Sequence, residues 1–327
     1  MKIVVADRNL RPHHQAFENN VPAGSQVTWL DAVDAPGADS TLAEAEVVVT
    51  SRFPADSLRR AHALRLVHAA GAGLDAIAGD ALPEGVQVAN TFHHEDSIAE
   101  YILASLILLR RRFVPQDRAL RTGKWSSPVY DSALAQPRTL SGSVVTFLGF
   151  GHIGTAAWRL LHHLGAEGIA ITGTGRVRAG EHGLRWAGTA DRLAAALEQS
   201  DVVVVSVPLT PTTRGLLGNR ALHALGAQGI VVNVARGPVV DQQALFAALQ
   251  SGRIAAAALD VWYRYPSADG HAEPADEPFH TLENVLMTPH SSGITTDTFH
   301  RRVLEIADNI TRLAEGRDLT NTVTIDD

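Results

Sequence analysis

The sequence contains no cysteine, only two lysines and no long hydrophobic run. Without cysteine the chain can form no disulfide, thiolate metal site, iron–sulfur cluster or cysteine nucleophile. The longest apolar stretch, Ile98 to Leu109, is interrupted by Glu100 and is too short to span a bilayer. The amino terminus lacks the cationic start and cleavage site of a secretory signal. We therefore expect a cytoplasmic protein without a membrane segment.

The composition is that of an ordinary folded protein with an excess of acidic residues. The chain has 327 residues, of which 45% are hydrophobic and 19% charged, and this length predicts two domains with sizeable cores. The formal net charge of −7 disfavours a surface that coats nucleic acid, so we expect no nucleic-acid partner. It remains compatible with a small basic pocket for an anionic ligand.

Short apolar runs alternate with Ala/Leu-rich stretches along almost the whole chain. Apolar runs separated by helices are typical of parallel strands that are buried on both faces. The pattern predicts an α/β fold with two doubly wound parallel sheets. The expected strands cover residues 3–6, 27–30, 47–50, 65–68 and 86–88 in one series, and 144–148, 169–172, 202–206, 230–234, 256–259 and 285–287 in the other.

A long helix is expected between the two series. Ser97 is suited to cap its amino terminus, with Glu100 at the third helical position and Ile102 and Leu106 in the apolar stripe that follows. The polar stretch from Gln116 to Pro137 is typical of a connection between domains.

Residues 149–154 read Gly-Phe-Gly-His-Ile-Gly and match the pattern GxGxxG. The match follows an expected strand, opens an amphipathic helix and precedes a second strand, which is the context that makes it informative. Gly149 permits a tight turn, Gly151 lets backbone amides approach a pyrophosphate, and Gly154 lets the helix lie close to the strand. We therefore predict a dinucleotide site.

The second strand of this unit is not followed by the acidic residue that binds a free ribose 2′-hydroxyl. It is followed instead by Thr174, Arg176 and Arg178, and no carboxylate occurs before Glu181. Hydroxyls and guanidinium groups suit a 2′-phosphate, so we predict a preference for NADP over NAD. The alternative is that both arginines are solvated loop residues.

Three segments later in the chain each follow an expected strand. They contain Arg236 in Val-Ala-Arg-Gly-Pro, Asp260 in Leu-Asp-Val-Trp, and His290 in Thr-Pro-His-Ser-Ser-Gly. Open α/β sheets bind ligands at the carboxyl edge of the strands. An arginine, an aspartate and a histidine are thus expected to converge near a nicotinamide.

These segments, the glycine motif and Gly71-Ala-Gly-Leu-Asp75 closely resemble the D-isomer-specific 2-hydroxyacid dehydrogenase family in order and spacing over almost the whole chain. The resemblance implies a Rossmann cofactor domain, residues 99–290, and a flavodoxin-like substrate domain, residues 1–98 with 291–327. The active site would lie between these domains. The implied reaction is hydride transfer between NAD(P)H and the C2 atom of a 2-oxo or 2-hydroxy acid.

The resemblance also assigns roles to individual residues. Arg236 would bind the substrate carboxylate and carbonyl oxygen, and His290 would transfer the hydroxyl proton. Asp260 would hold the nicotinamide carboxamide, and the backbone amides of Ala72 and Gly73 would bind the carboxylate. The complete set assigned to the cofactor is Gly149, Gly151, His152, Ile153, Gly154, Thr174, Arg176, Pro208, Thr213, Val234, Ala235 and Asp260.

One position departs from the family pattern. The family has a glutamate five residues after the aspartate, to orient the histidine and raise its pKa, whereas this chain has Tyr265 there. A phenol can hydrogen-bond an imidazole but carries no charge at neutral pH. Two alternatives are open: similarity to the formate dehydrogenase branch, which has an uncharged amide here, and replacement of the carboxylate by one from the polar loop, namely Glu273, Asp276 or Glu277.

Arg52, His93 and His94 are the candidates for contact with the rest of the substrate. Arg52 follows a strand at a place where relatives bind a distal anion, and the two histidines precede the interdomain helix. Adjacent histidines rarely chelate one ion, and the resemblance requires no metal.

The favoured function is NADPH-dependent reduction of a small, anionic 2-oxo acid that resembles glyoxylate or hydroxypyruvate. The alternatives are oxidation of formate or phosphite, and a nucleotide-sensing corepressor without catalysis. The apolar helix and Trp125 suggest a homodimer, as in relatives.

Overall fold

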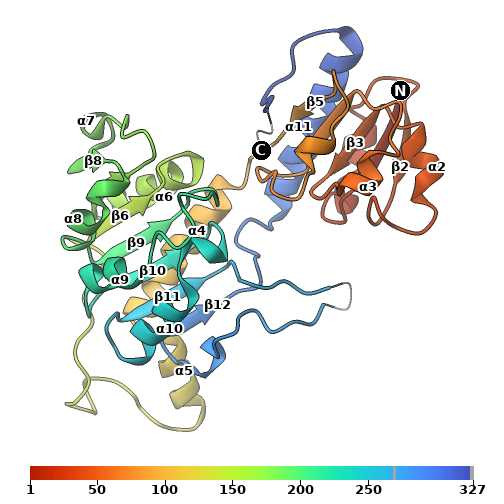
Figure 1. Ribbon diagram of the computed structural model, residues 1–327. Coiled ribbons are helices and arrows are strands. Elements are labelled where there is room, and N and C mark those ends of the chain that lie inside the picture. The colour runs from red at the N-terminus through yellow and green to blue at the C-terminus, as the bar shows by residue number, and fades with distance from the viewer. Residues whose placement is uncertain (268–269, 325–327) are drawn as a thin grey trace. The chain divides into compact units, whose positions relative to one another are not determined.

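The computed structural model describes residues 1–267 and 270–324, and it divides into two compact units (Figure 1). Unit 1 comprises Met1–His94 together with residues 294–324, and unit 2 comprises Glu95–Gly293. The chain therefore passes from unit 1 to unit 2 after His94 and returns after Gly293. These points lie a few residues from the boundaries expected from the sequence.

Unit 1 is built on a parallel sheet whose strand order, in the described residues, is β2-β1-β3-β4-β5. This is the strand order of a flavodoxin-like domain, which the family resemblance implied for this part of the chain. The strands are β1 (Lys2–Ala6), β2 (Gln26–Trp29), β3 (Val47–Thr50), β4 (Leu66–Ala69) and β5 (Gln87–Ala89). The helices are α1 (His14–Glu18), α2 (Ala38–Ala43), α3 (Ala55–Leu58) and α11 (Thr296–Glu315), with short 3₁₀ turns at Arg11–His13 and Gly79–Ala81.

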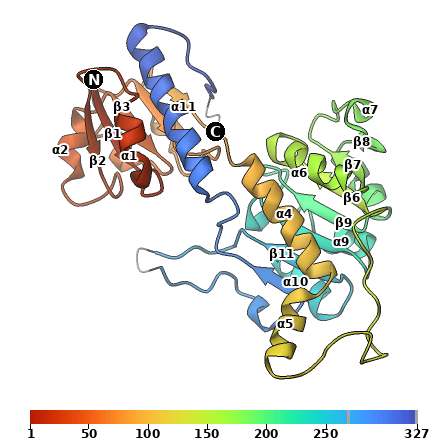
Figure 2. The ribbon, with the colours of Figure 1, turned by 180° about the vertical axis from the view of Figure 1, so that it is seen from behind.

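Helices cover both faces of this sheet, which explains its continuous apolar strands. Helices α1 and α11 pack on one face through residues such as Phe17 and Ile306, while α2 and α3 pack on the other through Leu42 and Leu58. Helix α11 comes from the last part of the chain and lies beside α1 (Figure 2). Unit 1 is therefore completed by a segment that returns to it from unit 2.

Unit 2 contains a parallel sheet with the order β12-β11-β10-β9-β6-β7-β8 in the described residues. The six strands from β11 to β8 have the Rossmann order, and β12 extends it. The strands are β6 (Val144–Leu148), β7 (Glu167–Ile171), β8 (Trp186–Gly188), β9 (Val202–Val205), β10 (Ile230–Asn233), β11 (Ala256–Leu259) and β12 (Val285–Met287). Strand β8 was not predicted, because it is a three-residue edge strand whose side chains are only half-buried.

The helices of unit 2 also form two layers around the sheet. The elements are α4 (Glu95–Arg110), α5 (Phe113–Arg121), α6 (His152–His163), α7 (Ala179–His182), α8 (Leu193–Leu197), α9 (Asn219–Leu225) and α10 (Gln242–Gln250), with 3₁₀ turns at Ala190–Arg192, Gly237–Val239 and Phe279–Thr281. Helices α4 and α6 cover one face of the sheet, and α8, α9 and α10 cover the other (Figure 2). The four valines of β9 between these layers are fully buried.

The structure corrects two expectations about the segment around α4. This helix begins at Glu95, so Ser97 lies inside its first turn and is not its cap; Glu95 and Asp96 place negative charge at the positive end of the helix dipole. The stretch from Gln116 to Pro137 lies within unit 2, and its first part is helical in α5. No helix in residues 1–267 and 270–324 has both the length and the hydrophobicity needed to cross a membrane.

Candidate active site

The predicted chemistry-bearing residues of unit 2 collect at one edge of its sheet. The strand pairs are parallel, so the carboxyl ends of the strands meet at the same edge. Gly149 directly follows β6, Arg236 follows β10, Asp260 follows β11 and His290 follows β12. Strands β6 and β9 are neighbours from which the chain winds in opposite directions, and this switch point is where such sheets bind ligands.

The glycine turn after β6 has the geometry of a dinucleotide-binding loop. Gly149 has φ of 96°, and a Cβ there would lie 2.8 Å from the backbone of Ser206. A Cβ at Gly154 would lie 2.6 Å from the carbonyl oxygen of Gly149, so only glycine lets helix α6 start this close to the strand. Gly151 caps α6 and faces open space, where the amides of His152 and Ile153 lie at the helix amino terminus. These residues fit a bound pyrophosphate.

The loop after β7 distinguishes the two arginines that the sequence offered for a 2′-phosphate. Arg178 forms an ion pair with Glu181 at 2.8 Å. Arg176 is exposed, and no carboxylate in the described part of the chain pairs with it. Thr174 is also exposed at this place. Arg176 is therefore better suited than Arg178 to bind a ligand phosphate.

The loops after β9 and β10 are fixed by short internal hydrogen bonds. The hydroxyl of Thr213 donates to the carbonyl oxygen of Pro208 at 2.7 Å. Asn233, at the end of β10, accepts from the amide of Ala235 at 3.1 Å and donates to the carbonyl oxygen of Arg236 at 3.1 Å. Val234 and Ala235 are buried. These hydrogen bonds fix the backbone of both loops near the edge of the sheet.

The side chain of Arg236 is half-buried at this edge. Its Nη1 atom donates to the carbonyl oxygen of Ala235 at 2.8 Å. A Cβ at Gly237 would lie 2.4 Å from the carbonyl oxygen of Trp262, so the turn that carries Arg236 lies against the chain after β11. Arg236 is thereby held beside the segment that also contains Asp260 and Tyr265.

Asp260 is fully buried, and its carboxylate organises the loop that carries His290. One oxygen accepts from the Thr288 hydroxyl at 2.6 Å and from the Ser291 amide at 2.9 Å. The other accepts from the Ser292 amide at 3.0 Å and from the Ser292 hydroxyl. These hydrogen bonds show that Asp260 stabilises the loop of His290, a role that the sequence did not reveal. They do not test the predicted contact of Asp260 with the nicotinamide carboxamide.

His290 lies in the left-handed backbone region with φ of 57°, which is unusual for a residue other than glycine. Thr288 precedes His290, and Ser291 and Ser292 follow it. All three donate hydrogen bonds to Asp260 and so hold this conformation. The loop receives a further support from Trp262, whose indole donates to the carbonyl oxygen of Thr288 at 2.8 Å. Strained residues of this kind cluster at functional sites.

Two charges act on the imidazole of His290. The protein atoms around the ring desolvate it and lower its pKa below the ordinary 6.5; the charge of Asp260 raises the pKa, and the charge of Arg236 lowers it. The residue as a whole is nevertheless exposed to solvent. The structure thus brings Arg236 and His290 close enough for one charge to influence the other.

Tyr265 lies beside His290, as its position in the sequence predicted. The ring centroids are 5.6 Å apart and the planes make an angle of 50°. The hydroxyl of Tyr265 accepts a hydrogen bond from the amide of Trp262 at 3.2 Å. Burial raises the pKa of Tyr265, so the phenol is neutral near the imidazole.

None of the described residues of the polar loop supplies the missing carboxylate. Asp276 is paired with Arg264. Among the described residues, the charges that shift the pKa of His290 are those of Asp260 and Arg236, and neither Glu273 nor Glu277 contributes. The family's glutamate is therefore replaced here by a neutral tyrosine.

In unit 1, the predicted substrate-binding residues follow β3, β4 and β5. The amides of Ala72 and Gly73 donate no hydrogen bond within the described residues, and Gly73 is exposed, so both are available to a ligand. Arg52 forms an ion pair with Asp34 at 2.5 Å, which lowers the pKa of that carboxyl. The guanidinium proposed for a distal anion already has a carboxylate partner.

His93 and His94 are held by two residues of α11 that the sequence analysis missed. The Nε2 atom of His93 lies 2.8 Å from a carboxylate oxygen of Glu305. The Nδ1 atom of His94 lies 2.9 Å from the Nη2 atom of Arg302. Arg302 and Glu305 are more than two hundred residues away in sequence and belong to no local motif, so only the fold could reveal them.

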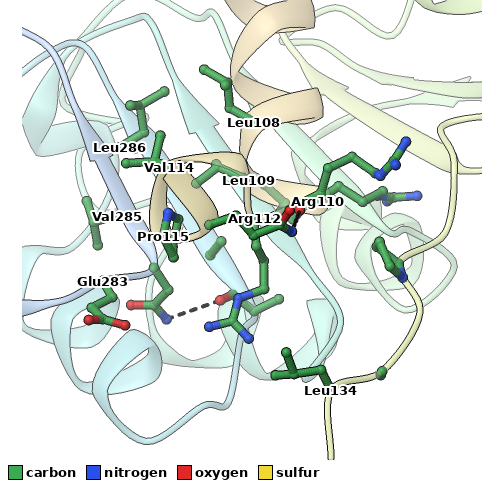
Figure 3. A pocket seen from close by; sticks show the side chains of 18 of the residues that line it. Leu108, Leu109, Arg110, Arg112, Val114, Pro115, Leu134, Glu283, Val285 and Leu286 are labelled. Carbon is green, nitrogen blue, oxygen red and sulfur yellow. Dashed lines mark hydrogen bonds between the residues drawn. The ribbon is translucent and has the colours of Figure 1, made fainter. Parts of the chain in front are cut away.

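A separate cavity of about 850 Å³ lies in unit 2. It is lined by the end of α4, by α5 and by β12, with Leu109, Val114 and Leu286 on its apolar side and Arg110 and Arg112 close by (Figure 3). Its lining includes Ile230 and Ala256, which open strands β10 and β11. The cavity is thus at the amino edge of the sheet and contains none of the predicted site residues.

Comparison with known proteins agrees with this arrangement. Residues 103–292 match the model of the D-isomer specific 2-hydroxyacid dehydrogenase NAD binding domain. A glyoxylate/hydroxypyruvate reductase of Arabidopsis thaliana is 31% identical over 80% of this chain and 78% of its own length. A solved D-isomer specific 2-hydroxyacid dehydrogenase of Xanthobacter autotrophicus, in complex with NADPH and MES, is 30% identical over 98% of each chain, with a TM-score of 0.78.

A second solved structure is similar at lower identity. It is an NADPH-dependent glyoxylate/hydroxypyruvate reductase of Sinorhizobium meliloti in complex with NADP and malonate; it is 25% identical over 98% of this chain and 96% of its own, with a TM-score of 0.79. The chain belongs to the D-isomer specific 2-hydroxyacid dehydrogenase family. It is an NAD(P)-dependent oxidoreductase that transfers hydride between the cofactor and a 2-oxo or 2-hydroxy acid.

Proposed function

We propose that this protein reduces a small 2-oxo acid, of the size of glyoxylate or hydroxypyruvate, with NADPH as the preferred cofactor. The observation that carries the proposal is the proximity of Arg236 and His290 at the carboxyl edge of the unit 2 sheet. A guanidinium and an imidazole are the groups that a 2-oxo acid requires, one for its carboxylate and one for its carbonyl oxygen.

In this proposal each residue has a defined task. Arg236 binds the carboxylate and the carbonyl oxygen through its planar fork, and His290 donates a proton to that oxygen as it becomes a hydroxyl. The amides of Ala72 and Gly73 bind the carboxylate. Tyr265 holds the imidazole by ring contact and adds no charge. The nicotinamide, when bound, supplies the hydride.

The cofactor preference rests on the loop after β7. Arg176 and Thr174 are exposed there, and a 2′-phosphate would receive charge-assisted hydrogen bonds from a guanidinium. The glycine turn, the loops at Pro208, Thr213, Val234 and Ala235, and Asp260 complete the proposed cofactor site. The Sinorhizobium reductase was solved in complex with NADP and the Xanthobacter dehydrogenase in complex with NADPH, which supports the same choice.

The test is a panel of acids assayed with both cofactors. Purified protein is mixed with NADPH or NADH and glyoxylate, hydroxypyruvate or pyruvate, and loss of nicotinamide absorbance is followed. Formate and phosphite are assayed in the oxidative direction with NADP and NAD. Turnover of a 2-oxo acid with NADPH supports the proposal. Turnover of formate or phosphite alone, or NADPH binding without any turnover, would replace it by one of the two alternatives.

We further propose that the protein is a homodimer. Between Phe113 and Tyr130 the chain exposes several large apolar side chains, of which Trp125 and Tyr130 pack edge-on with centroids 5.5 Å apart. Exposed apolar patches on folded proteins mark interaction surfaces. The cytoplasmic location expected from the sequence stays a prediction.

A further inference from the structure

Two tyrosines in the chain after β11 use their hydroxyls in opposite ways. The hydroxyl of Tyr263 donates to the carbonyl oxygen of Val240 at 3.0 Å. The hydroxyl of Tyr265 instead accepts from the amide of Trp262 at 3.2 Å. A phenol has one proton to donate, so the donor of Tyr263 is already used within the protein, whereas that of Tyr265 is not. In the described part of the chain no group accepts a hydrogen bond from Tyr265.

The hydroxyl of Tyr265 lies next to two groups of the candidate active site. Its oxygen accepts from Trp262, whose carbonyl oxygen lies 2.4 Å from the position of a Cβ at Gly237, the residue after Arg236. The ring of the same tyrosine lies 5.6 Å from that of His290. All of these residues belong to unit 2, so their arrangement does not depend on unit 1. Tyr265 is therefore placed beside both the turn of Arg236 and the imidazole.

The charges that act on the phenol agree with this position. Burial raises the pKa of Tyr265, the hydrogen bond from Trp262 and the charge of Arg236 lower it, and the charge of Asp260 raises it. Arg236 and Asp260 also shift the pKa of His290. The phenol and the imidazole thus face the same two charges. Because the pKa of Tyr265 lies above its ordinary value of 10, the phenol keeps its proton near neutral pH.

A tyrosine and a glutamate at this position offer opposite groups to a substrate. An ionised glutamate only accepts hydrogen bonds, and it repels an oxygen that becomes negative. A phenol donates, and the amide that donates to its oxygen strengthens that donor. When hydride reaches C2 of a 2-oxo acid, the carbonyl oxygen gains negative charge until it receives a proton. A neutral donor directed at this oxygen stabilises the transition state more than the ground state.

We propose that Tyr265 is a catalytic residue whose hydroxyl donates a hydrogen bond to the C2 oxygen of the substrate, beside Arg236 and His290. The phenol keeps its own proton throughout. Hydride adds to C2, His290 gives the proton that converts the C2 oxygen into a hydroxyl, and Tyr265 stabilises the charge on this oxygen. The inference rests on the proposed function and deepens it, because it gives the residue that departs from the family pattern a direct task in the reaction.

The first test measures the hydride step in two variants that each lack one oxygen atom. Tyr265→Phe should slow the single-turnover reduction of glyoxylate by NADPH, followed by stopped flow, by about tenfold or more, with KM changed by less than about twofold. Tyr263→Phe removes a hydroxyl that already donates to Val240, so it is the matched control and should keep the wild-type rate. Equal rates in Tyr265→Phe and the wild type overturn the inference.

The pH dependence of Tyr265→Phe separates donation to the substrate from donation to His290. A phenol that donates to the imidazole favours its neutral form, so its removal would raise the pKa of His290. A phenol that donates to the substrate leaves this pKa in place. The midpoint of kcat/KM against pH should therefore be the same in Tyr265→Phe and the wild type, although the plateau is lower. A midpoint that rises in Tyr265→Phe assigns the donor to the imidazole and overturns the inference.

A binding experiment without turnover separates this inference from the proposed function. The chain has four tyrosines, so protein labelled with carbon-13 at the tyrosine Cζ gives four resonances, which phenylalanine variants assign. Oxamate has the shape of a 2-oxo acid but accepts no hydride, and it is added to protein saturated with NADPH. The resonance of Tyr265 should move downfield, as expected for a stronger donor, and that of Tyr263 should stay. Oxamate that binds, by calorimetry, without moving the Tyr265 resonance overturns the inference alone, whereas oxamate that does not bind also contradicts the proposed function.

Discussion

The ring of Tyr265 lies 5.6 Å from that of His290, and its hydroxyl accepts from the amide of Trp262. The residue that stands where the family places a glutamate therefore contacts the histidine without giving it a charge. As a result, desolvation and the charge of Arg236 lower the pKa of His290, and the charge of Asp260 opposes them.

This relationship predicts a specific pH dependence. Reduction requires a protonated His290, so kcat/KM for a 2-oxo acid should be highest below the lowered pKa and should fall as the pH rises through it. Tyr265→Glu places a carboxylate beside the ring, which favours the protonated imidazole, so the fall should begin about one pH unit higher. The measurement is kcat/KM between pH 5 and 9. Tyr265→Phe is the control and should leave the midpoint in place; a midpoint that does not move in Tyr265→Glu would show that residue 265 does not act on His290.

Substitutions of Arg236 separate its geometry from its charge. Arg236→Lys and Arg236→Gln both remove the planar fork, and kcat/KM should fall by about a hundredfold or more in each. Only Arg236→Gln removes the positive charge, so only this variant should raise the pKa of His290. NMR titration of the imidazole in the two variants checks the difference. Equal pKa values in both would mean that the charge of Arg236 does not reach His290.

The cofactor proposal predicts different effects for two neighbouring arginines. Arg176→Ala should lower the ratio of kcat/KM for NADPH to that for NADH by about tenfold, the value of a charge-assisted hydrogen bond. Arg178→Ala is the matched control, because Arg178 is already paired with Glu181. Steady-state kinetics with both cofactors measure the ratios. A wild-type preference for NADH that Arg176→Ala leaves unchanged would refute the proposal.

Much of this site could be predicted because it depends on local sequence. The apolar runs in β3 and β9 give buried parallel strands, and residues that follow such strands must meet at one edge. The glycine motif is also local, because the backbone that a Cβ at Gly154 would meet belongs to Gly149, within the same six residues. Strand β8 escaped prediction because a half-buried edge strand of three residues has no distinctive pattern.

The contacts that the sequence could not reveal are those between distant segments. Arg302 and Glu305 reach the loop after β5 only because α11 returns to unit 1, and Asp34 reaches Arg52 from another loop. The four hydrogen bonds to Asp260 come from a segment about thirty residues away, and they become visible only when β11 and β12 are paired. Motifs identified the reactive groups, whereas their supporting contacts required the fold.

His68 predicts how stability depends on pH. It is fully buried on β4, its Nδ1 atom lies 3.0 Å from the carbonyl oxygen of Ala69, and its Nε2 atom lies 3.0 Å from the amide nitrogen of Asn309. Burial lowers its pKa to about 4, while the contact with Ala69 and the charge of Glu305 act in the opposite direction.

The unfolded chain binds this proton near pH 6.5 and the folded chain only near pH 4, so acid favours unfolding. The free energy of unfolding should therefore fall between these pH values, by about 3 kcal/mol in total for this one group. His68→Gln keeps an acceptor for Asn309 and has no such titration, so its stability should fall less over the same range. Urea unfolding of the wild type and of His68→Gln at pH 7, 5.5 and 4.5 gives the comparison. An equal loss in the free energy of unfolding of both proteins would exclude His68 as the source.

The exposed apolar segment after α5 predicts the assembly state. Trp125, Val129 and Tyr130 are 62%, 81% and 68% exposed, so a second copy that covers them would bury large apolar surfaces that are now in water. Light scattering after size-exclusion chromatography should therefore give twice the chain mass of 34.9 kDa for the wild type. The double variant Trp125→Ser/Tyr130→Ser should give the monomer mass with the fold intact by circular dichroism.

Leu164→Ser removes an apolar side chain that is 44% exposed at the end of α6, and it should leave the dimer unchanged. A wild-type protein that is monomeric at micromolar concentration would mean that these aromatic side chains serve another partner.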